Sequence, residues 1–251
     1  MELGRKRFQG IGNIIRFNWH FYLIACLGLA LLFAFSSYLP ASLQTLALSL
    51  ALLVTLTITT SLAVSYYVYD LSDLYQLRWL SDADDKTVLN VNAGFDETSD
   101  LIRVYFPKVD LTICDFYNEE QHTEPSIKRA RRAYPLIEDT LVVSTDRLPF
   151  SEDSFDYSLA ILSAHEIRNE KERIVFFKEL NRVTKSEGQI YVTEHLRDFN
   201  NFLAYSIGSF HFHSKSTWKR TFDHANLKIA GEIKSTPFIT TFILKKNGAS
   251  V

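Results

Sequence analysis

The chain has 251 residues, which is enough for one full α/β domain and a smaller additional segment. Its formal net charge of -2 gives no global electrostatic reason to expect nucleic acid as a partner. The two cysteines, Cys26 and Cys114, both lie in apolar stretches, so we expect reduced core residues rather than a disulfide or a zinc site.

The first third of the chain is predicted to be a membrane anchor. Residues 17–69 contain no Asp, Glu, Lys or Arg. One helical span needs about 20 apolar residues, and residues 19–39 and 42–66 supply two spans that Pro40 separates. A cleaved signal peptide is the alternative, because residues 5–7 are basic and precede an apolar run. The second apolar segment of full length argues against it.

Basic residues set the expected orientation of the anchor. Arg5, Lys6, Arg7 and Arg16 precede the first span, whereas the turn between the spans has no basic residue, so both termini and the domain are expected in the cytoplasm. Residues 70–86 repeat Leu, Tyr and Trp at helical spacing. We expect an amphipathic linker helix that packs on the domain, because a helix lying on the membrane would be more basic.

From residue 87 onward, strand and helix signals alternate. The expected strands are 87–91, 109–115, 140–144, 155–163, 189–194 and a closing pair at 227–233 and 237–244, and the expected helices begin at Thr98 or Ser99 and span 126–134 and 171–183. This order predicts an α/β, Rossmann-like, mostly parallel sheet with helices on both faces and a closing antiparallel strand pair. The expected divisions are a basic arm (1–16), two transmembrane helices (17–69), an amphipathic linker (70–86) and the domain (87–251).

Three motifs stand out in the predicted domain. VLNVNAGFD (88–96) reads as a buried strand, a tight turn and the start of a helix, LPFSEDSFD (148–156) leads into the fourth strand, and ELNRVTKSEGQIYVTE (179–194) ends in the fifth. Together they resemble the class I S-adenosylmethionine-dependent methyltransferases, over residues 87–246. The resemblance implies a methyltransferase-like domain with S-adenosylmethionine as its cofactor.

The first motif departs from that family at three positions. The usual acidic residue is Asn90, the first glycine is Asn92 and the third is Asp96, so that only Gly94 remains. Asn tolerates left-handed backbone geometry, so we expect Asn92 still to make the turn. Asn90 loses a charge that would favour the ammonium group of the cofactor, and Asp96 and Glu97 are candidates to compensate.

The acidic loop also bears on the choice of cofactor. A dinucleotide brings a pyrophosphate, which binds at a helix N-terminus free of anions, whereas Asp96 and Glu97 stand there. S-adenosylmethionine has no phosphate and has two cationic groups, so this loop suits it. Asp115, at the end of the second strand, can accept hydrogen bonds from ribose hydroxyls, and a capping or turn aspartate is the alternative.

The resemblance implies cofactor contacts at the ends of the first three strands. The residues are Asn90, Asn92, Ala93, Gly94, Asp96, Asp115, Phe116, Ser144, Thr145 and Asp146. For the last three, an exposed loop is an equal alternative.

Methyl transfer needs little protein chemistry, because the sulfonium is already activated and the enzyme mainly aligns the acceptor and excludes water. His165, just beyond the fourth strand, is the candidate base, and Glu166 is a candidate to orient it. The alternative is that His165 caps the next helix or packs beside the cofactor.

Histidines in the last third of the chain raise the question of a metal. His195, His211 and His213, with Glu194 and His122, lack the closely spaced ligand pairs of structural zinc, so no metal is expected. The aromatic stretch 199–212 reads as a core helix, or else as an acceptor pocket or a second membrane contact.

The sequence therefore favours a membrane-anchored methyltransferase that acts on a lipid-soluble or membrane-associated small-molecule acceptor, with no nucleic-acid partner. The alternative is a catalytically inactive module that binds a ligand or a protein at the membrane. A dinucleotide or nucleotide-sugar enzyme is disfavoured by the acidic loop.

Overall fold

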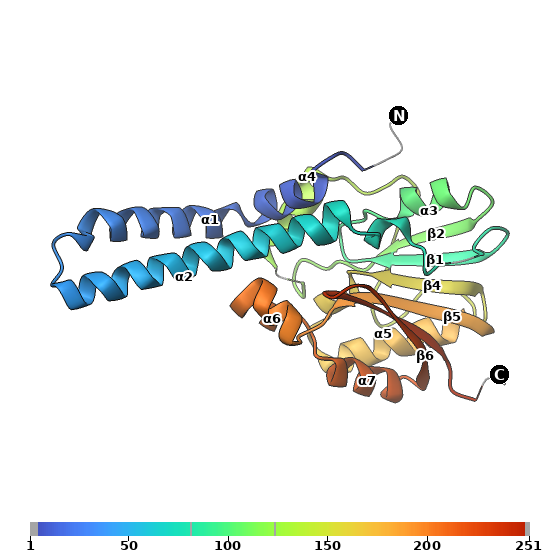
Figure 1. The fold of residues 1–251 in the computed structure, drawn as a ribbon. Helices are drawn as coiled ribbons and strands as arrows, with labels where there is room; N and C mark the ends of the chain where they lie inside the picture. Colours follow the sequence, from blue (N-terminus) through green and yellow to red (C-terminus); the bar gives the residue numbers. More distant parts are fainter. Residues whose placement is uncertain (1–4, 81, 123, 249–251) are drawn as a thin grey trace.

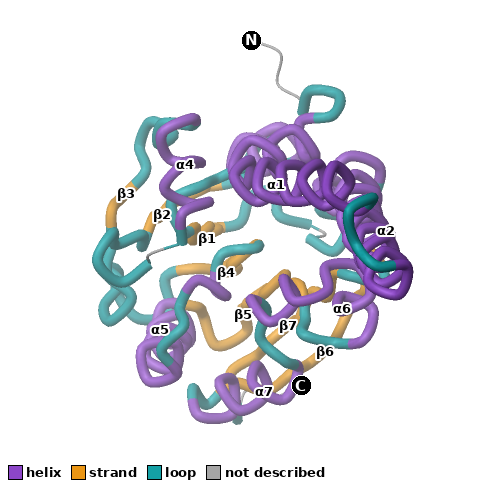
Figure 2. Tube along the Cα trace, turned by 90° about the vertical axis from the view of Figure 1, so that its left-hand side faces the viewer, coloured by secondary structure: helices purple, strands orange, loops and turns teal. Residues whose placement is uncertain are grey.

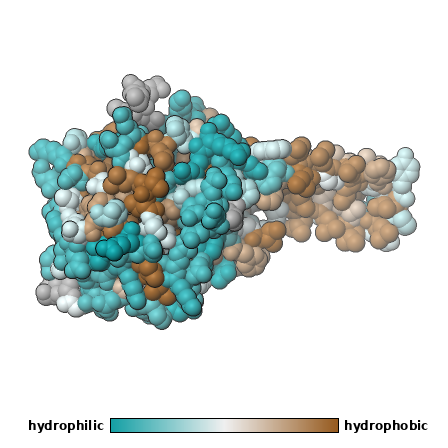
Figure 3. Space-filling view, turned by 180° about the vertical axis from the view of Figure 1, so that it is seen from behind, coloured by the Kyte–Doolittle hydropathy of each residue, from teal (hydrophilic) through white to brown (hydrophobic). Residues whose placement is uncertain are grey.

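Two long helices project together from one end of an α/β domain (Figure 1). The computed structural model describes residues 5–80, 82–122 and 124–248. Helices α1 (Gln9–Ser36) and α2 (Ala41–Tyr66) form the hairpin, and α2 continues into a π-helical turn (Tyr67–Leu71). By length and composition both helices could cross a membrane. Their side chains form the long apolar surface in Figure 3.

The base of the hairpin is closed by polar and steric contacts. The carboxylate of Asp70 accepts hydrogen bonds from the backbone N–H groups of Gly10 and Ile11, both at 2.8 Å, and so caps the N-terminus of α1. A Cβ atom on Gly10 would lie 2.4 Å from the Cβ of Tyr69, so the close approach of the two segments requires glycine. Helix α1 thus begins at Gln9, inside the predicted basic arm.

The linker packs on the domain, as predicted, but it is not a continuous helix. After the π-helical turn the chain is extended at Ser72, and only Leu74–Gln76 form a short 3-10 turn. Four apolar side chains of the linker are buried against one face of the sheet, namely those of Leu77, Trp79, Leu80 and Ala83. They pack there with Val88, Ile102 and Tyr191. An irregular path lets these side chains cover a flat sheet face, which the single stripe of a helix would not do.

The sheet confirms the predicted Rossmann-like architecture. Its strands are β1 (Thr87–Asn92), β2 (Asp110–Asp115), β3 (Leu141–Val142), β4 (Phe155–Ile161), β5 (Thr184–His195), β6 (Leu227–Thr236) and β7 (Ile239–Lys246). Their order is β3-β2-β1-β4-β5-β7-β6. The first five strands are parallel, and β7 runs antiparallel to β5 and β6 as the closing pair.

Helices cover the sheet and join it to the hairpin (Figure 2). They are α3 (Ser99–Tyr105), α4 (Pro125–Ala133), α5 (Glu170–Val183), α6 (Phe199–Tyr205) and α7 (Lys215–His224). The sequence analysis missed α7, which the Ser214 side chain caps. Its Trp218 and Phe222 pack with Phe177 of α5 in the larger core. Helix α4 contacts α1, and α6 contacts α2.

The carboxyl ends of the parallel strands face the hairpin (Figure 1). Tyr69 Oη, in the π-helical turn, lies 2.8 Å from Nε2 of His195 at the end of β5. Glu97, in the loop after β1, forms an ion pair with Arg5 at 2.6 Å. Ligands of open α/β sheets bind at this edge. The edge that is expected to bind ligand therefore lies beside the candidate membrane anchor.

Candidate active site

The loop after β1 turns at Gly94, which has φ 87°. Asn92 is still the last residue of β1 and pairs in register with Asp115 of β2, and it is not among the residues with positive φ. The expectation that Asn92 makes a left-handed turn is therefore wrong. The strand continues one residue further than a turn at Asn92 would allow, and glycine supplies the unusual geometry.

Asn90 and Asp96, two positions at which the first motif departs from the methyltransferase pattern, form hydrogen bonds with the start of α3. Asn90 is buried, and its amide donates hydrogen bonds to Thr98 Oγ1 at 3.0 Å and Ser99 Oγ at 2.8 Å. Asp96 Oδ1 accepts from the backbone N–H groups of the same two residues, at 2.8 and 3.0 Å. Asp96 thus acts as a helix cap.

Glu97 contacts the junction with the hairpin. Besides its ion pair with Arg5, it accepts a hydrogen bond from Tyr75 Oη at 2.7 Å. Its carboxylate is engaged by these groups and is not available to compensate for the charge missing at Asn90.

The carboxylate of Asp115, predicted to bind the ribose, is already occupied. Asp115 is 1% exposed, and its Oδ1 accepts a hydrogen bond from the backbone N–H of Tyr117 at 2.9 Å. Its Oδ2 is bound by the guanidinium of Arg131 from α4. A Cβ atom on Gly94 would lie 2.9 Å from Cδ of Arg131, so this arginine also lies against the glycine loop. The sequence analysis missed Arg131, and its one signal was the basic run in 126–134.

Helix α4 owes its position to the hairpin. Arg129 donates a hydrogen bond to the backbone carbonyl of Phe17 in α1. Just after α4, Tyr134 Oη donates to Asn13 Oδ1 at 2.9 Å. The hairpin therefore helps to place Arg131 on Asp115.

The other residues predicted to contact the cofactor have different environments. Ala93 and Phe116 are buried, and the ring of Phe116 packs 5.2 Å from that of Phe176. Thr145 is buried and donates to Glu172 Oε1 at 2.8 Å. The remaining two, Ser144 and Asp146, are exposed on the loop after β3.

His165 lies in a 3-10 turn (Ala164–Glu166) directly after β4, at the predicted edge. Its Nδ1 is 2.7 Å from Glu194 Oε2 of β5, and its backbone N–H donates to Glu194 Oε1 at 3.1 Å. Its Nε2 is 3.3 Å from Oε1 of Glu166. Glu194 thus fixes the ring, a role that the sequence analysis gave to Glu166.

These contacts set the protonation of His165. Burial alone would lower the pKa of its imidazole, but the carboxylates of Glu194 and Glu166 outweigh burial and raise the pKa to about 10. At neutral pH the ring is therefore a cation. It can accept a proton only after this one has been displaced.

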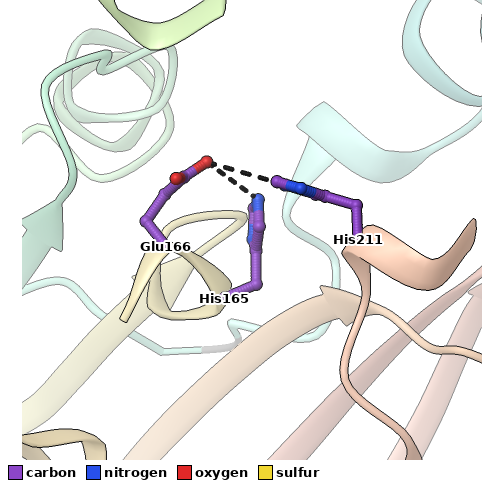
Figure 4. Close-up of side chains that lie close together, drawn as sticks. All are labelled: His165, Glu166 and His211. Carbon is purple, nitrogen blue, oxygen red and sulfur yellow. Dashed lines mark ion pairs between the residues drawn. The ribbon is translucent and has the colours of Figure 1, made fainter. Parts of the chain in front are cut away.

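His211 is the one of the three later histidines that joins this group. It ends the 3-10 turn Ser206–His211, and its Nε2 is 3.8 Å from Glu166 Oε1 (Figure 4). His195 contacts Asn201 Oδ1 at 2.9 Å, and burial lowers its pKa to about 4. His213 contacts Arg173 at 3.2 Å.

The carboxyl edge therefore has two parts. One consists of the glycine loop and Asp115, where the resemblance implies the cofactor. The other consists of His165 and Glu166, in the turn after β4, and of His211, at the end of the turn before α7.

The chain is similar to several solved structures. A SAM dependent methyltransferase from Aquifex aeolicus is 13% identical, with a TM-score of 0.49, over 72% of this chain and 92% of its own. A protein from Pyrococcus horikoshii is 16% identical, with a TM-score of 0.49, over 68% and 85%. LaPhzM is 12% identical, with a TM-score of 0.50, over 75% and 57%. At this identity and TM-score, the similarity to LaPhzM shows a common fold alone.

None of the curated proteins matches the chain. The sequence model of the ubiE/COQ5 methyltransferase family, however, matches residues 64–218, which is more than half of the chain. The match includes the end of α2, the linker, the glycine loop, Asp115 and the turn with His165. The chain therefore belongs to the ubiE/COQ5 methyltransferase family.

Proposed function

We propose that this protein is a membrane-anchored methyltransferase that transfers a methyl group from S-adenosylmethionine to a small acceptor dissolved in, or associated with, the membrane. The single observation that supports the acceptor class is the segment between β5 and α7. This segment is both an exposed apolar surface and part of the candidate active site.

The apolar surface of this segment continues that of the hairpin. Five large apolar side chains on α6 and the 3-10 turn after it are 46% to 79% exposed: Phe199, Phe202, Leu203, Ile207 and Phe210. Helix α6 contacts α2 (Figure 1). A soluble surface rarely exposes such a group without a partner. The same turn ends at His211, so an acceptor in the lipid has a short path to the site.

The base of the hairpin has the composition of a lipid headgroup region. Arg16, Arg129 and Arg132 line a cavity of about 280 Å³ together with Phe17 and Trp19. Arginine and tryptophan at this level are typical of a membrane–water interface. The positive charge lies at the domain end of the hairpin, which favours a cytoplasmic domain.

The cofactor is S-adenosylmethionine, as the sequence predicted and as membership of a methyltransferase family implies. The residues fit it, because Gly94 has no side chain at the turn and Asp115 holds a buried carboxylate beside the end of β1. The chemistry that the cofactor supplies when bound is transfer of its sulfonium methyl group to a nucleophilic atom of the acceptor, leaving a neutral thioether. The ribose can reach Asp115 only after the ion pair between Arg131 and Asp115 has broken.

The protein's own part is to place the acceptor, exclude water and accept a proton. The sequence analysis predicted that His165 is the base that accepts this proton. Because Glu194 and Glu166 keep this ring protonated, His165 can act as a base only after it has lost this proton.

The proposal can be tested on the full chain in detergent micelles or nanodiscs. We expect calorimetric titration to show binding of S-adenosylmethionine and none of NAD, and a labelled methyl group to pass into the organic phase of a lipid extract. Asp115→Ala serves as the control with an impaired cofactor site. Absence of binding at millimolar S-adenosylmethionine would refute the methyltransferase.

That negative result would favour the second candidate, an inactive methyltransferase-like module that binds a ligand or protein at the membrane. Two observations support this alternative. Arg131 forms an ion pair with the carboxylate of Asp115, and the side chains of Asn90 and Asp96 form hydrogen bonds with the start of α3.

Orientation can be tested by labelling cysteines from outside the cell in a chain with Cys26→Ser. We expect Ser42→Cys, between the spans, to be labelled and Ser151→Cys, exposed on the domain, to stay unlabelled. The reverse pattern would refute a cytoplasmic domain. Ser214 is unsuitable here because it caps α7.

A further inference from the structure

Three side chains from two separate turns meet at the acceptor end of the site (Figure 4). Nε2 of His165 is 3.3 Å and Nε2 of His211 is 3.8 Å from the same oxygen, Oε1 of Glu166. One ligand atom from each residue lies within 4.8 Å of the other two. Metal–ligand bonds of about 2.0–2.2 Å in a tetrahedral site place two ligand atoms about 3.4 Å apart. An ion therefore fits with small side-chain shifts.

Both imidazoles are oriented in the way that metal-binding histidines usually are. Nδ1 of His165 is 2.7 Å from Glu194 Oε2, and Nδ1 of His211 is 3.4 Å from Glu124 Oε1. A metal-binding histidine commonly donates its second ring N–H to a carboxylate, which fixes the tautomer. In His165 this arrangement leaves Nε2 facing Oε1 of Glu166. In His211 the guanidinium of Arg168 contacts both ring nitrogens, so Nε2 can bind an ion only when Arg168 moves away.

Glu166 has an unsatisfied oxygen. The residue is 3% exposed, and its Oε2 is buried without a hydrogen-bond partner among the residues that the structure describes. A buried oxygen of this kind is costly unless something binds it. The two rings face Oε1, so a cation between them would remove this cost if the carboxylate binds it through both oxygens.

The charges around the cluster also call for a cation. Three carboxylates, Glu124, Glu166 and Glu194, face the two rings, against one guanidinium, that of Arg168. With neutral imidazoles the group would have an excess of two negative charges. A divalent cation would offset all of it.

Arg168 opposes an ion at this place. Its Nη2 lies 2.7 Å from Nε2 of His211, and it also donates to the backbone carbonyl of His211. Its side chain is 36% exposed and can swing into solvent. The affinity of the cluster for a cation should therefore rise when Arg168 is removed.

We propose that His165, Glu166 and His211 bind a divalent transition-metal ion. Two imidazoles and one carboxylate favour Zn²⁺, Co²⁺ or Fe²⁺ over Mg²⁺ or Ca²⁺. Three protein ligands leave a coordination position open, as in catalytic rather than structural sites. The sequence analysis expected no metal because the set that it weighed, His195, His211, His213, Glu194 and His122, lacks closely spaced ligand pairs. The fold instead brings His211 to His165 and Glu166.

The role of the ion rests on the proposed function. An ion here would hold an oxygen atom of the acceptor at the carboxyl edge, and it would lower the pKa of a hydroxyl group bound to it, whose proton leaves to solvent. This narrows the acceptor class to molecules with an oxygen donor, such as a hydroxyl group. Binding of the ion itself does not depend on that role.

The test uses the full chain in detergent, stripped of metal with a chelator and titrated with Co²⁺ while visible absorption is recorded. Zn²⁺ content after dialysis is measured independently by mass spectrometry. We expect one ion per chain. Affinity should fall at least tenfold in His211→Ala and Glu166→Gln, and about 10- to 100-fold in Glu194→Gln. Arg168→Ala should bind more tightly. His224→Ala, an exposed histidine of α7, is the matched control and should bind like the wild type.

The absence of a stoichiometric ion in the wild type would overturn the proposal. So would equal affinity in the wild type, His211→Ala and Glu166→Gln, with circular dichroism used to confirm that the variants are folded. Titration of the same samples with S-adenosylmethionine separates the two proposals. If the protein binds the cofactor but no ion, only the metal proposal is refuted. If it binds the ion but no cofactor, the methyltransferase proposal is refuted and the metal proposal stands.

Discussion

Replacing Arg131 with alanine should tighten the binding of S-adenosylmethionine. In the structure Asp115 is 1% exposed and Arg131 binds its Oδ2. The ribose hydroxyls are expected to use the same carboxylate, so the wild type must break this contact before the cofactor is seated. The Arg131→Ala variant has no such contact to break.

The expected gain follows from the burial of the two partners. A hydrogen bond to a charged group contributes about 1.5–3 kcal/mol when it is buried. The guanidinium side chain is 29% exposed, and solvent screening reduces the figure to about 1–2 kcal/mol. This corresponds to a dissociation constant about 5- to 30-fold lower in Arg131→Ala. Without ligand the variant should be less stable than the wild type, because Asp115 then has no cationic partner.

The assay is calorimetric titration of the full chain in detergent, with circular dichroism to verify the fold. Arg132→Ala removes the same charge from the next position of α4 and should bind like the wild type. Asp115→Ala should weaken binding by about 1–3 kcal/mol. Unchanged or weaker binding in folded Arg131→Ala would refute the competition, and unchanged binding in Asp115→Ala would remove Asp115 from the site.

Four further predictions follow from the site and its surroundings. Gly94→Ala should lower stability by about 1–3 kcal/mol, because φ is 87° and the new Cβ would lie 2.9 Å from Cδ of Arg131; chemical denaturation showing no change would contradict this. Asn92→Val should stay folded within about 1 kcal/mol of the wild type, because Asn92 ends a strand; a larger loss by the same measurement would restore the turn role. A metal must displace the proton of His165, whose pKa the carboxylates of Glu194 and Glu166 raise to about 10 against the effect of burial, so Co²⁺ affinity should rise about tenfold per pH unit from about pH 7 to 9; a flat profile in cobalt titrations would rule out His165 as a ligand. A nitroxide label attached to Ile207→Cys in nanodiscs should be accessible to oxygen, which dissolves in lipid, and inaccessible to a water-soluble nickel chelate. A label on Glu187→Cys should show the opposite accessibilities. Equal accessibility of both labels to the chelate would place α6 in water.

Local patterns in the sequence were enough to determine most of the architecture. The charge-free run at 17–69 gave the two long apolar helices, because a minimum length of apolar residues is read directly from the chain. Alternating strand and helix signals gave the parallel sheet and the closing antiparallel pair. Cofactor class followed from motifs that are themselves contiguous. The position of His165 followed too, because a residue just after a parallel strand must lie at the ligand edge.

The chemistry of the site was decided by tertiary structure. Arg131 and Asp115 are 16 positions apart, and they meet because the hairpin holds α4 against the end of β2. His165 and Glu194 are 29 positions apart, and they meet because β4 and β5 are neighbours in the sheet. His211 reaches them through a turn that packs on α6, which in turn contacts α2. Contacts of this kind leave no periodic signal in the chain, because they depend on strand order and helix docking rather than on the residues beside each partner.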